Sequence, residues 1–143
     1  SAADEALAAR LERAVWEDGA CEVFLREWYT QPLFASLAEK PVLFERVILS
    51  RLASWPSAPA AALRAFGRGA QPSLWDALSP ITRPALLLTG ARDTRHADIL
   101  QEMAERLSDT TVEILPDCGH AAYLEAPAAF AEKVAAFVCR RRA

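Results

Sequence analysis

The chain contains no serine in the G-x-S-x-G pattern, in which flanking glycines let a nucleophilic serine stand on a sharp turn. It has only two lysines, Lys40 and Lys133, and a net charge of −3, so we expect neither a nucleic-acid partner nor binding to an anionic membrane. No apolar run reaches the roughly 18 residues of a membrane span, and no secretory signal is recognisable. These absences argue against a nucleic-acid-binding, membrane-bound or secreted protein. They also leave the chain without a visible nucleophile.

Cysteine is also scarce. Cys21, Cys118 and Cys139 are odd in number and do not form a C-x-x-C pair, which argues against a disulfide framework and against a structural zinc site. The run Cys118-Gly119-His120 offers two potential metal ligands without a third nearby, so we expect no metal. The sequence thus favours a reducing compartment and predicts no cofactor.

What is present predicts a packed α/β protein. Of the 143 residues, 52% are apolar and 24% charged, which excludes a disordered chain. Residues 1–80 show helical patterns interrupted by proline and glycine, and residues 84–143 alternate strand-like runs with helices. The helices are expected over Asp4–Trp16, Cys21–Tyr29, Pro41–Ala53, Ser57–Phe66 (with Ser57 as N-cap), Ser73–Leu78, Ala97–Leu107 and Pro127–Val138.

Two apolar runs have the composition of buried strands, and a polar side chain follows each. Ala85–Thr89 leads to Asp93, and Thr111–Leu115 leads to His120, with one helix expected between the two runs. In a parallel βαβ unit both post-strand loops open at the carboxyl edge of the sheet, so this carboxylate and this imidazole can meet. A carboxylate on one ring nitrogen fixes the tautomer and makes the other nitrogen a competent base. Asp93 and His120 are the predicted catalytic residues.

Other polar features have simpler interpretations. His96 stands beside Arg95 at the expected start of a helix, and we interpret it as a solvated surface residue. Gly67-Arg-Gly69 is too short for a phosphate-binding loop. Arg140-Arg141-Arg142 follows the last helix, where positive charge complements the helix dipole.

The two strands create a physical difficulty. Parallel strands are normally buried on both faces within larger sheets, and two strands with two helices do not make an independent core. The α/β part is therefore expected to be the end of a sheet whose other strands lie elsewhere.

The order of these features resembles the C-terminal part of an α/β-hydrolase fold: a helical lid or cap over residues 1–80, then two parallel strands with flanking helices over residues 84–143. The superfamily signals are Gly90-Ala-Arg-Asp93 and Gly119-His120, followed by Glu125-Ala-Pro127. The run Trp28-Tyr-Thr-Gln-Pro-Leu-Phe-Ala-Ser-Leu37 is more specific and resembles the MenH family, with further similarity at Ser50-Arg51 and Gln71-Pro72. A similar domain ends the plant and algal protein PHYLLO.

The resemblance implies a lyase reaction on a hydrolase scaffold. Enzymes of the MenH family remove a proton from 2-succinyl-5-enolpyruvyl-6-hydroxy-3-cyclohexene-1-carboxylate and eliminate pyruvate, in menaquinone and phylloquinone biosynthesis. The base is a serine activated by the His and Asp of a triad, and that serine would precede this chain. The substrate is a polycarboxylate, and arginines of the lid can bind its carboxylates with two parallel hydrogen bonds. The resemblance matches Arg51 to such a lid arginine and matches Trp28 and Phe34 to aromatic residues of the pocket.

Alternatives remain open at this point. An esterase or carbon–carbon hydrolase would use the same acid and base, and a non-enzymatic interaction module could retain a truncated hydrolase end. Trp28 and Phe34 could serve packing alone, and Arg51 could be a solvated helix residue. The expected partners are the substrate and the N-terminal half of the same fold, and the expected location is the cytoplasm, or the plastid stroma in a plant or alga.

Overall fold

The computed structural model describes residues 2–16, 19–54, 59–66 and 71–140. The chain forms two compact units: unit 1 comprises Ser1–Gln31 and Pro41–Ser73, and unit 2 comprises Pro32–Lys40 and Leu74–Ala143. The expected N-cap Ser57, the Gly67–Gly69 run and the arginines after Arg140 lie outside the described residues. No helix in the described ranges is long and apolar enough to cross a membrane.

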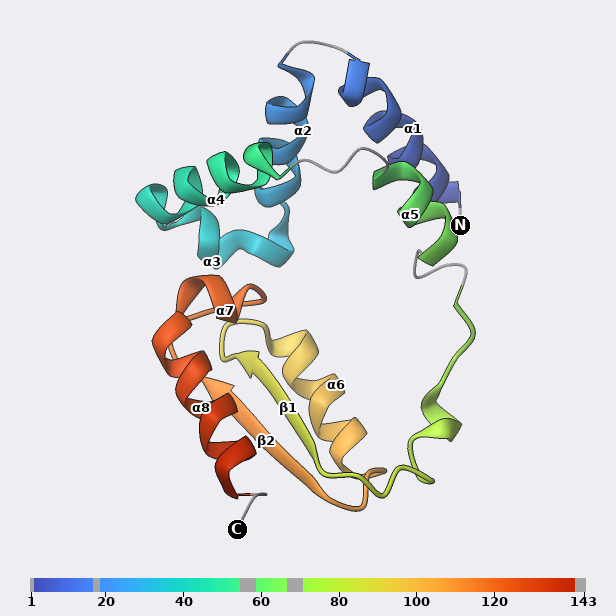
Figure 1. Ribbon diagram of the computed structural model, residues 1–143, viewed down its shortest axis with the longest axis vertical. Helices are drawn as coiled ribbons and strands as arrows, with labels where there is room; N and C mark the ends of the chain where they lie inside the picture. The colour runs from blue at the N-terminus through green and yellow to red at the C-terminus, as the bar shows by residue number, and fades with distance from the viewer. Residues whose placement is uncertain (1, 17–18, 55–58, 67–70, 141–143) are drawn as a thin grey trace. The chain divides into compact units, whose positions relative to one another are not determined.

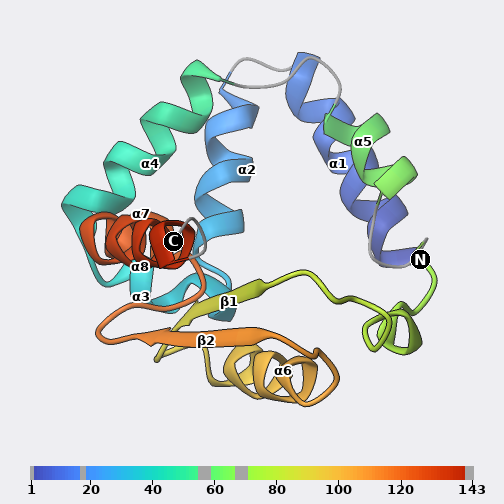
Figure 2. The ribbon, with the colours of Figure 1, turned by 60° about the horizontal axis from the view of Figure 1, so that its bottom comes forward.

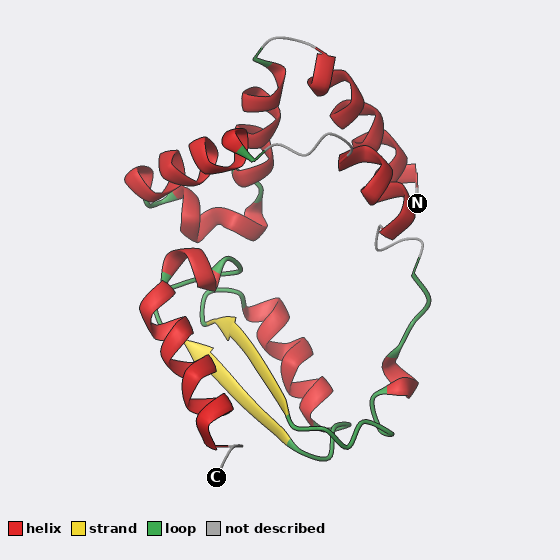
Figure 3. Cartoon of the chain, in the orientation of Figure 1, coloured by secondary structure: helices red, strands yellow, loops and turns green. Residues whose placement is uncertain are grey.

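Every secondary-structure element in the described part of unit 1 is a helix (Figure 3). Its helices, labelled in Figure 1, are α1 (Ala2–Trp16), α2 (Ala20–Tyr29), α4 (Pro41–Ala53) and α5 (Pro59–Phe66). The bounds of α4 are those predicted from the sequence. Proline is favourable in the first turn of a helix, where its missing N–H would have no partner, and both α4 and α5 begin with one.

A cluster of buried apolar side chains joins three helices of unit 1. Ala8 and Leu11 of α1, Phe24 of α2 and Ala60 of α5 are buried against one another. At the surface, Arg64 of α5 forms ion pairs with two glutamates of α1. Because exposed pairs contribute little to stability, apolar burial is the main force that holds these helices together.

Unit 2 contains both strands. Its elements are the 3-10 helix η1 (Pro32–Phe34), α3 (Ala35–Ala38), the 3-10 helix η2 (Trp75–Ala77), β1 (Ala85–Gly90), α6 (Thr94–Ala104), β2 (Thr110–Leu115), α7 (Ala122–Glu125) and α8 (Pro127–Arg140). The sequence did not predict α3 and α7, because a four-residue helix is too short to show a period. Pro32–Lys40 falls inside the range expected to form the lid, yet it belongs to unit 2.

β1 and β2 pair in parallel, with Ala85 opposite Thr110 and Gly90 opposite Leu115. This pairing confirms the predicted βαβ unit. Figures 1 and 2 show α6 against one face of the two strands and α8 against the other. On the α8 side, Leu115, Cys118 and Ala122 form the buried core. Because the two strands are parallel, both end at the same edge of the sheet.

The loops that follow the two strands touch through their backbones. Ala91 N donates to the carbonyl of Leu115 at 2.7 Å, and Arg92 N donates to that of Cys118 at 3.0 Å. A side chain at Gly90 would overlap the carbonyl oxygens of Cys118 and Gly119, so only glycine allows this approach. Gly90 thus brings the loop of Asp93 against the loop of His120.

Candidate active site

Asp93 and His120 meet at the carboxyl ends of β1 and β2. Oδ2 of Asp93 lies 2.7 Å from Nδ1 of His120. This distance confirms the hydrogen bond predicted from the order of strands and loops. The Asp93 residue is 8% exposed, whereas the His120 side chain is 35% exposed. The pair therefore combines a buried carboxylate with an imidazole that solvent or a substrate can reach.

His96 is also part of this site, so its assignment as a solvated surface residue is wrong. Its Nδ1 lies 2.8 Å from Oδ1 of Asp93, and its side chain is only 24% exposed. The reason is the start of α6, which begins at Thr94 rather than at the expected Ala97. Asp93 becomes the N-cap and accepts a hydrogen bond from the backbone N–H of His96 at 3.3 Å. An aspartate followed three positions later by a histidine at a helix start was the signal available in the sequence.

The protonation state follows from these contacts. Burial raises the pKa of Asp93, but hydrogen bonds from His96 and His120 outweigh it, so the pKa of this carboxyl lies below its ordinary value. An ionised carboxylate has no hydrogen to donate, so each neutral imidazole carries its hydrogen on Nδ1. The lone pair of His120 is then on Nε2. This is the tautomer that a general base or a proton relay requires.

Phe34 lies beside the imidazole of His120. Their ring centroids are 5.7 Å apart in an edge-on arrangement, and the rings of His96 and His120 are 4.6 Å apart. Phe34 ends the short η1 helix, so the structure brings a residue of the specific run Trp28–Leu37 to the predicted base. The contact gives the partly exposed imidazole an apolar neighbour.

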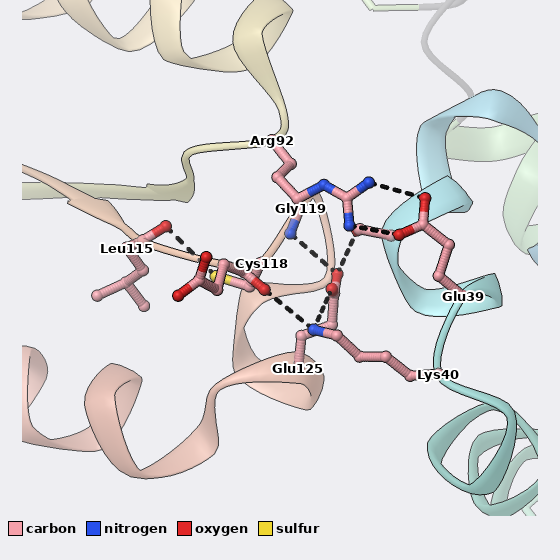
Figure 4. A network of polar contacts seen from close by, with 9 residues as sticks. Glu39, Lys40, Arg92, Leu115, Cys118, Gly119 and Glu125 are labelled. Carbon is pink, nitrogen blue, oxygen red and sulfur yellow. Dashed lines mark hydrogen bonds and ion pairs between the residues drawn. The ribbon is translucent and has the colours of Figure 1, made fainter.

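Glu125 fixes the backbone just before His120 (Figure 4). Its side chain is fully buried and accepts hydrogen bonds from Gly119 N at 3.1 Å, Ser36 Oγ at 2.9 Å and Lys40 Nζ at 2.9 Å. Any side chain at Gly119 would collide with Ser36. The sequence contained Glu125 within a family motif, but it gave no hint that this carboxylate connects α3 to the loop of His120.

A second ion pair joins the same segments. Arg92 donates two hydrogen bonds, each 2.7 Å long, to the two carboxylate oxygens of Glu39 (Figure 4). Arg92 immediately precedes Asp93, and Glu39 follows α3. Both ends of the predicted acid–base pair are thus connected to the segment that carries Phe34.

Trp28 and Arg51 belong to unit 1. Trp28 stacks on Phe24 with ring centroids 6.1 Å apart, at the edge of the unit 1 core. Arg51 Nε donates to the hydroxyl oxygen of Tyr29 at 3.1 Å. The assignment of these two side chains to a substrate pocket stays a prediction.

The site also presents a set of metal-ligand types. One potential ligand atom each from Asp93, His96 and His120 lies within 4.8 Å of the others. The sequence argument against a metal considered only the neighbours of Cys118 and overlooked His96. Cys118 itself is buried, its Sγ contacts the carbonyl of Leu115, and burial raises the pKa of its thiol, so it is a core residue.

Comparison with known proteins agrees with this geometry. Residues 2–133 match the sequence model of the Alpha/beta hydrolase family. The chain belongs to the α/β-hydrolase family. This membership and the pair of parallel strands with flanking helices confirm the fold predicted from the sequence.

The similarity extends to one group of enzymes within the family. A Salmonella heidelberg 2-succinyl-6-hydroxy-2,4-cyclohexadiene-1-carboxylate synthase is 34% identical over 137 residues, 89% of this chain and 51% of that protein. A Bacillus subtilis protein that carries the same activity as a provisional name is 34% identical over 132 residues, 90% of this chain and 47% of that protein. The solved structure of MenH from S. aureus matches with a TM-score of 0.87 and 29% identity, over 99% of this chain and 52% of that one. This α/β-hydrolase chain is related to MenH and spans about half the length of the relatives it matches.

Proposed function

We propose that this chain supplies the acid and the base of a Ser-Asp-His triad to a 2-succinyl-6-hydroxy-2,4-cyclohexadiene-1-carboxylate synthase. The complete enzyme would be a carbon–oxygen lyase. It would remove a proton from 2-succinyl-5-enolpyruvyl-6-hydroxy-3-cyclohexene-1-carboxylate and eliminate pyruvate, in menaquinone or phylloquinone biosynthesis. The serine of this triad is not in the chain, which has no nucleophile elbow.

The observation that carries this proposal is the 2.7 Å contact between Asp93 and His120 at the carboxyl edge of the sheet. With its hydrogen on Nδ1, His120 would accept the proton of the serine hydroxyl at Nε2. Asp93 would stabilise the resulting imidazolium, since an ionised carboxylate interacts more strongly with a cation than with a neutral ring. The serine oxygen would then take the substrate proton as the carbon–oxygen bond to the enolpyruvyl group breaks. The released enolate would take up the proton held on His120 to become pyruvate, which returns the imidazole to its neutral form.

The substrate carries several carboxylates, and three residues are proposed to bind it. Arg51 would bind one carboxylate with its guanidinium group, which can donate two parallel hydrogen bonds. Trp28 and Phe34 would line the apolar part of the pocket. Of these three, Phe34 has the strongest structural support because its ring contacts His120. Residues 1–80 would act as the lid and residues 84–143 as part of the hydrolase core.

An esterase or carbon–carbon hydrolase is the alternative, because the same pair would serve a serine that forms an acyl-enzyme. The two reactions differ in product and intermediate. Pyruvate release from the enolpyruvyl substrate by the protein that includes the serine-bearing half would support the lyase, with His120→Ala as the blank. Covalent trapping by a fluorophosphonate together with ester turnover, and no pyruvate, would instead identify a hydrolase.

A further inference from the structure

The two histidines of this chain are both hydrogen-bonded to one carboxylate. The sequence contains no others, and His96 and His120 contact opposite oxygens of Asp93 at 2.8 and 2.7 Å. A proton relay needs only one histidine on its carboxylate. The second imidazole gives the site two nitrogen donors and one oxygen donor.

We infer that Asp93, His96 and His120 form a binding site for a divalent transition-metal ion, with Zn²⁺ as the best fit. Two imidazoles and one carboxylate, with a fourth position open to water, are a recurring ligand set for zinc. The three ligand atoms lie within 4.8 Å of one another, whereas tetrahedral zinc holds its ligands about 3.3 Å apart. Binding would lengthen the two contacts between Asp93 and the imidazoles from 2.7 and 2.8 Å to about this value and would draw the two rings toward one ion. Rotation of the two partly exposed rings would allow this adjustment.

The protons balance without a change in charge on the rings. In the metal-free site each neutral imidazole donates its Nδ1 hydrogen to Asp93. On binding, the ion takes the place of these shared hydrogens and each ring carries its hydrogen on Nε2 instead. The carboxylate of Asp93, which both rings contact, supplies one negative charge against the cation.

Occupancy would inhibit the enzyme, a consequence that rests on the proposed function. A metal-bound His120 with its hydrogen on Nε2 has no lone pair for the serine proton. Zinc would thus act as a reversible inhibitor held by Asp93 and the two imidazoles. This inference replaces the sequence-based expectation that the chain binds no metal.

The test is isothermal titration with ZnCl₂ of the untagged 143-residue chain, alone and together with the proposed serine-bearing half, with Co²⁺ absorption as a second readout. One equivalent of zinc should bind, and Co²⁺ should give the intense visible bands of a four-coordinate site. His96→Gln keeps a side-chain donor for Asp93 but is a poor zinc ligand. Because loss of an outer partner alone weakens metal binding by about 10- to 100-fold, loss of this ligand should weaken it at least as much.

His120→Gln should have the same effect, and Cys139→Ser, which removes an exposed thiol in α8, should leave the affinity unchanged. Circular dichroism of each variant checks that the fold is retained. Zinc affinity equal to that of the unsubstituted chain in both folded histidine variants, or no binding to the unsubstituted protein, would overturn the inference. Binding without inhibition of pyruvate release would leave the metal site intact and count against His120 as the base of the proposed triad, whereas absence of pyruvate release from the metal-free protein would count against the proposed lyase itself.

Discussion

Oδ2 of Asp93 lies 2.7 Å from Nδ1 of His120, although 27 positions separate the two residues in the sequence. The contact exists because parallel pairing aligns Gly90 with Leu115 and because the absence of a side chain at position 90 lets the two loops touch. The acid–base geometry is thus a property of the βαβ unit. It can be tested by changes on either side of the contact.

In the protein that includes the serine-bearing half, Asp93→Asn should lower kcat on the order of 10³- to 10⁴-fold. Asparagine keeps the N-cap of α6, but it donates to Nδ1 or leaves it in the wrong tautomer. Pyruvate release measured beside circular dichroism separates loss of chemistry from loss of fold. Wild-type turnover by Asp93→Asn would remove this residue from the triad.

The lowered pKa of Asp93 predicts a pH dependence of stability. A carboxyl whose pKa is lower in the folded protein than in the unfolded chain stabilises the fold above its unfolded pKa of about 4. That contribution disappears as the pH falls from about 4 through the folded pKa, because both states are then protonated. Urea unfolding of wild type and Asp93→Asn over this range should show a shallower loss of stability in the variant. Parallel curves would contradict the assignment.

Arg51→Ala should cost about 2 to 4 kcal/mol in transition-state stabilisation, measured as kcat/KM, if Arg51 binds a substrate carboxylate. Arg51→Lys should recover only part of it, because an ammonium group cannot donate two parallel hydrogen bonds. Arg46→Ala, an exposed arginine of the same helix, is the matched control and should be near neutral. An unchanged kcat/KM in Arg51→Ala would exclude the residue from the pocket.

Tyr29→Phe tests how Arg51 is held. Removing the hydroxyl that accepts from Arg51 Nε should raise KM with a smaller change in kcat, since the guanidinium remains but is less well oriented. The structure of the helices should persist because the ring itself is retained. Identical KM values for Tyr29→Phe and wild type would show that this hydrogen bond does not orient Arg51.

Glu125→Ala should lower the free energy of unfolding by about 2 to 4 kcal/mol, because it leaves Lys40, Ser36 and the N–H of Gly119 without their buried partner. Glu125→Gln should be milder, since the amide oxygen still accepts one hydrogen bond. Chemical denaturation gives the stability, and the NMR shift of the His120 ring reports its position. Stability equal to wild type in Glu125→Ala would show that the network in Figure 4 contributes nothing.

The 143 residues alone should release no pyruvate and should associate in solution. They lack an elbow serine, and α8 exposes an apolar groove lined by Phe130, Val134 and Val138. Addition of the serine-bearing half in trans is expected to restore both turnover and a defined size in gel filtration. Turnover by the short chain near the rate of the complete protein would mean that the nucleophile has been misassigned.

The sequence by itself determined the fold class, the two strands and the pairing of Asp93 with His120. These follow from patterns that repeat along the chain, since strand composition, the intervening helix and the handedness of βαβ units leave one arrangement. The run around Phe34 also pointed to its family without any structural information.

Only the tertiary structure decided the position of His96 and the role of Glu125. His96 joined the site because Asp93 begins α6 earlier than the apolar pattern indicated, and such a cap depends on local backbone geometry. Glu125 is buried between α3 and the loop of His120. Its hydrogen-bond partner Ser36 lies 89 positions away in the sequence. The contacts of Glu125 depend on how short, non-periodic segments pack, and no pattern along the chain encodes them.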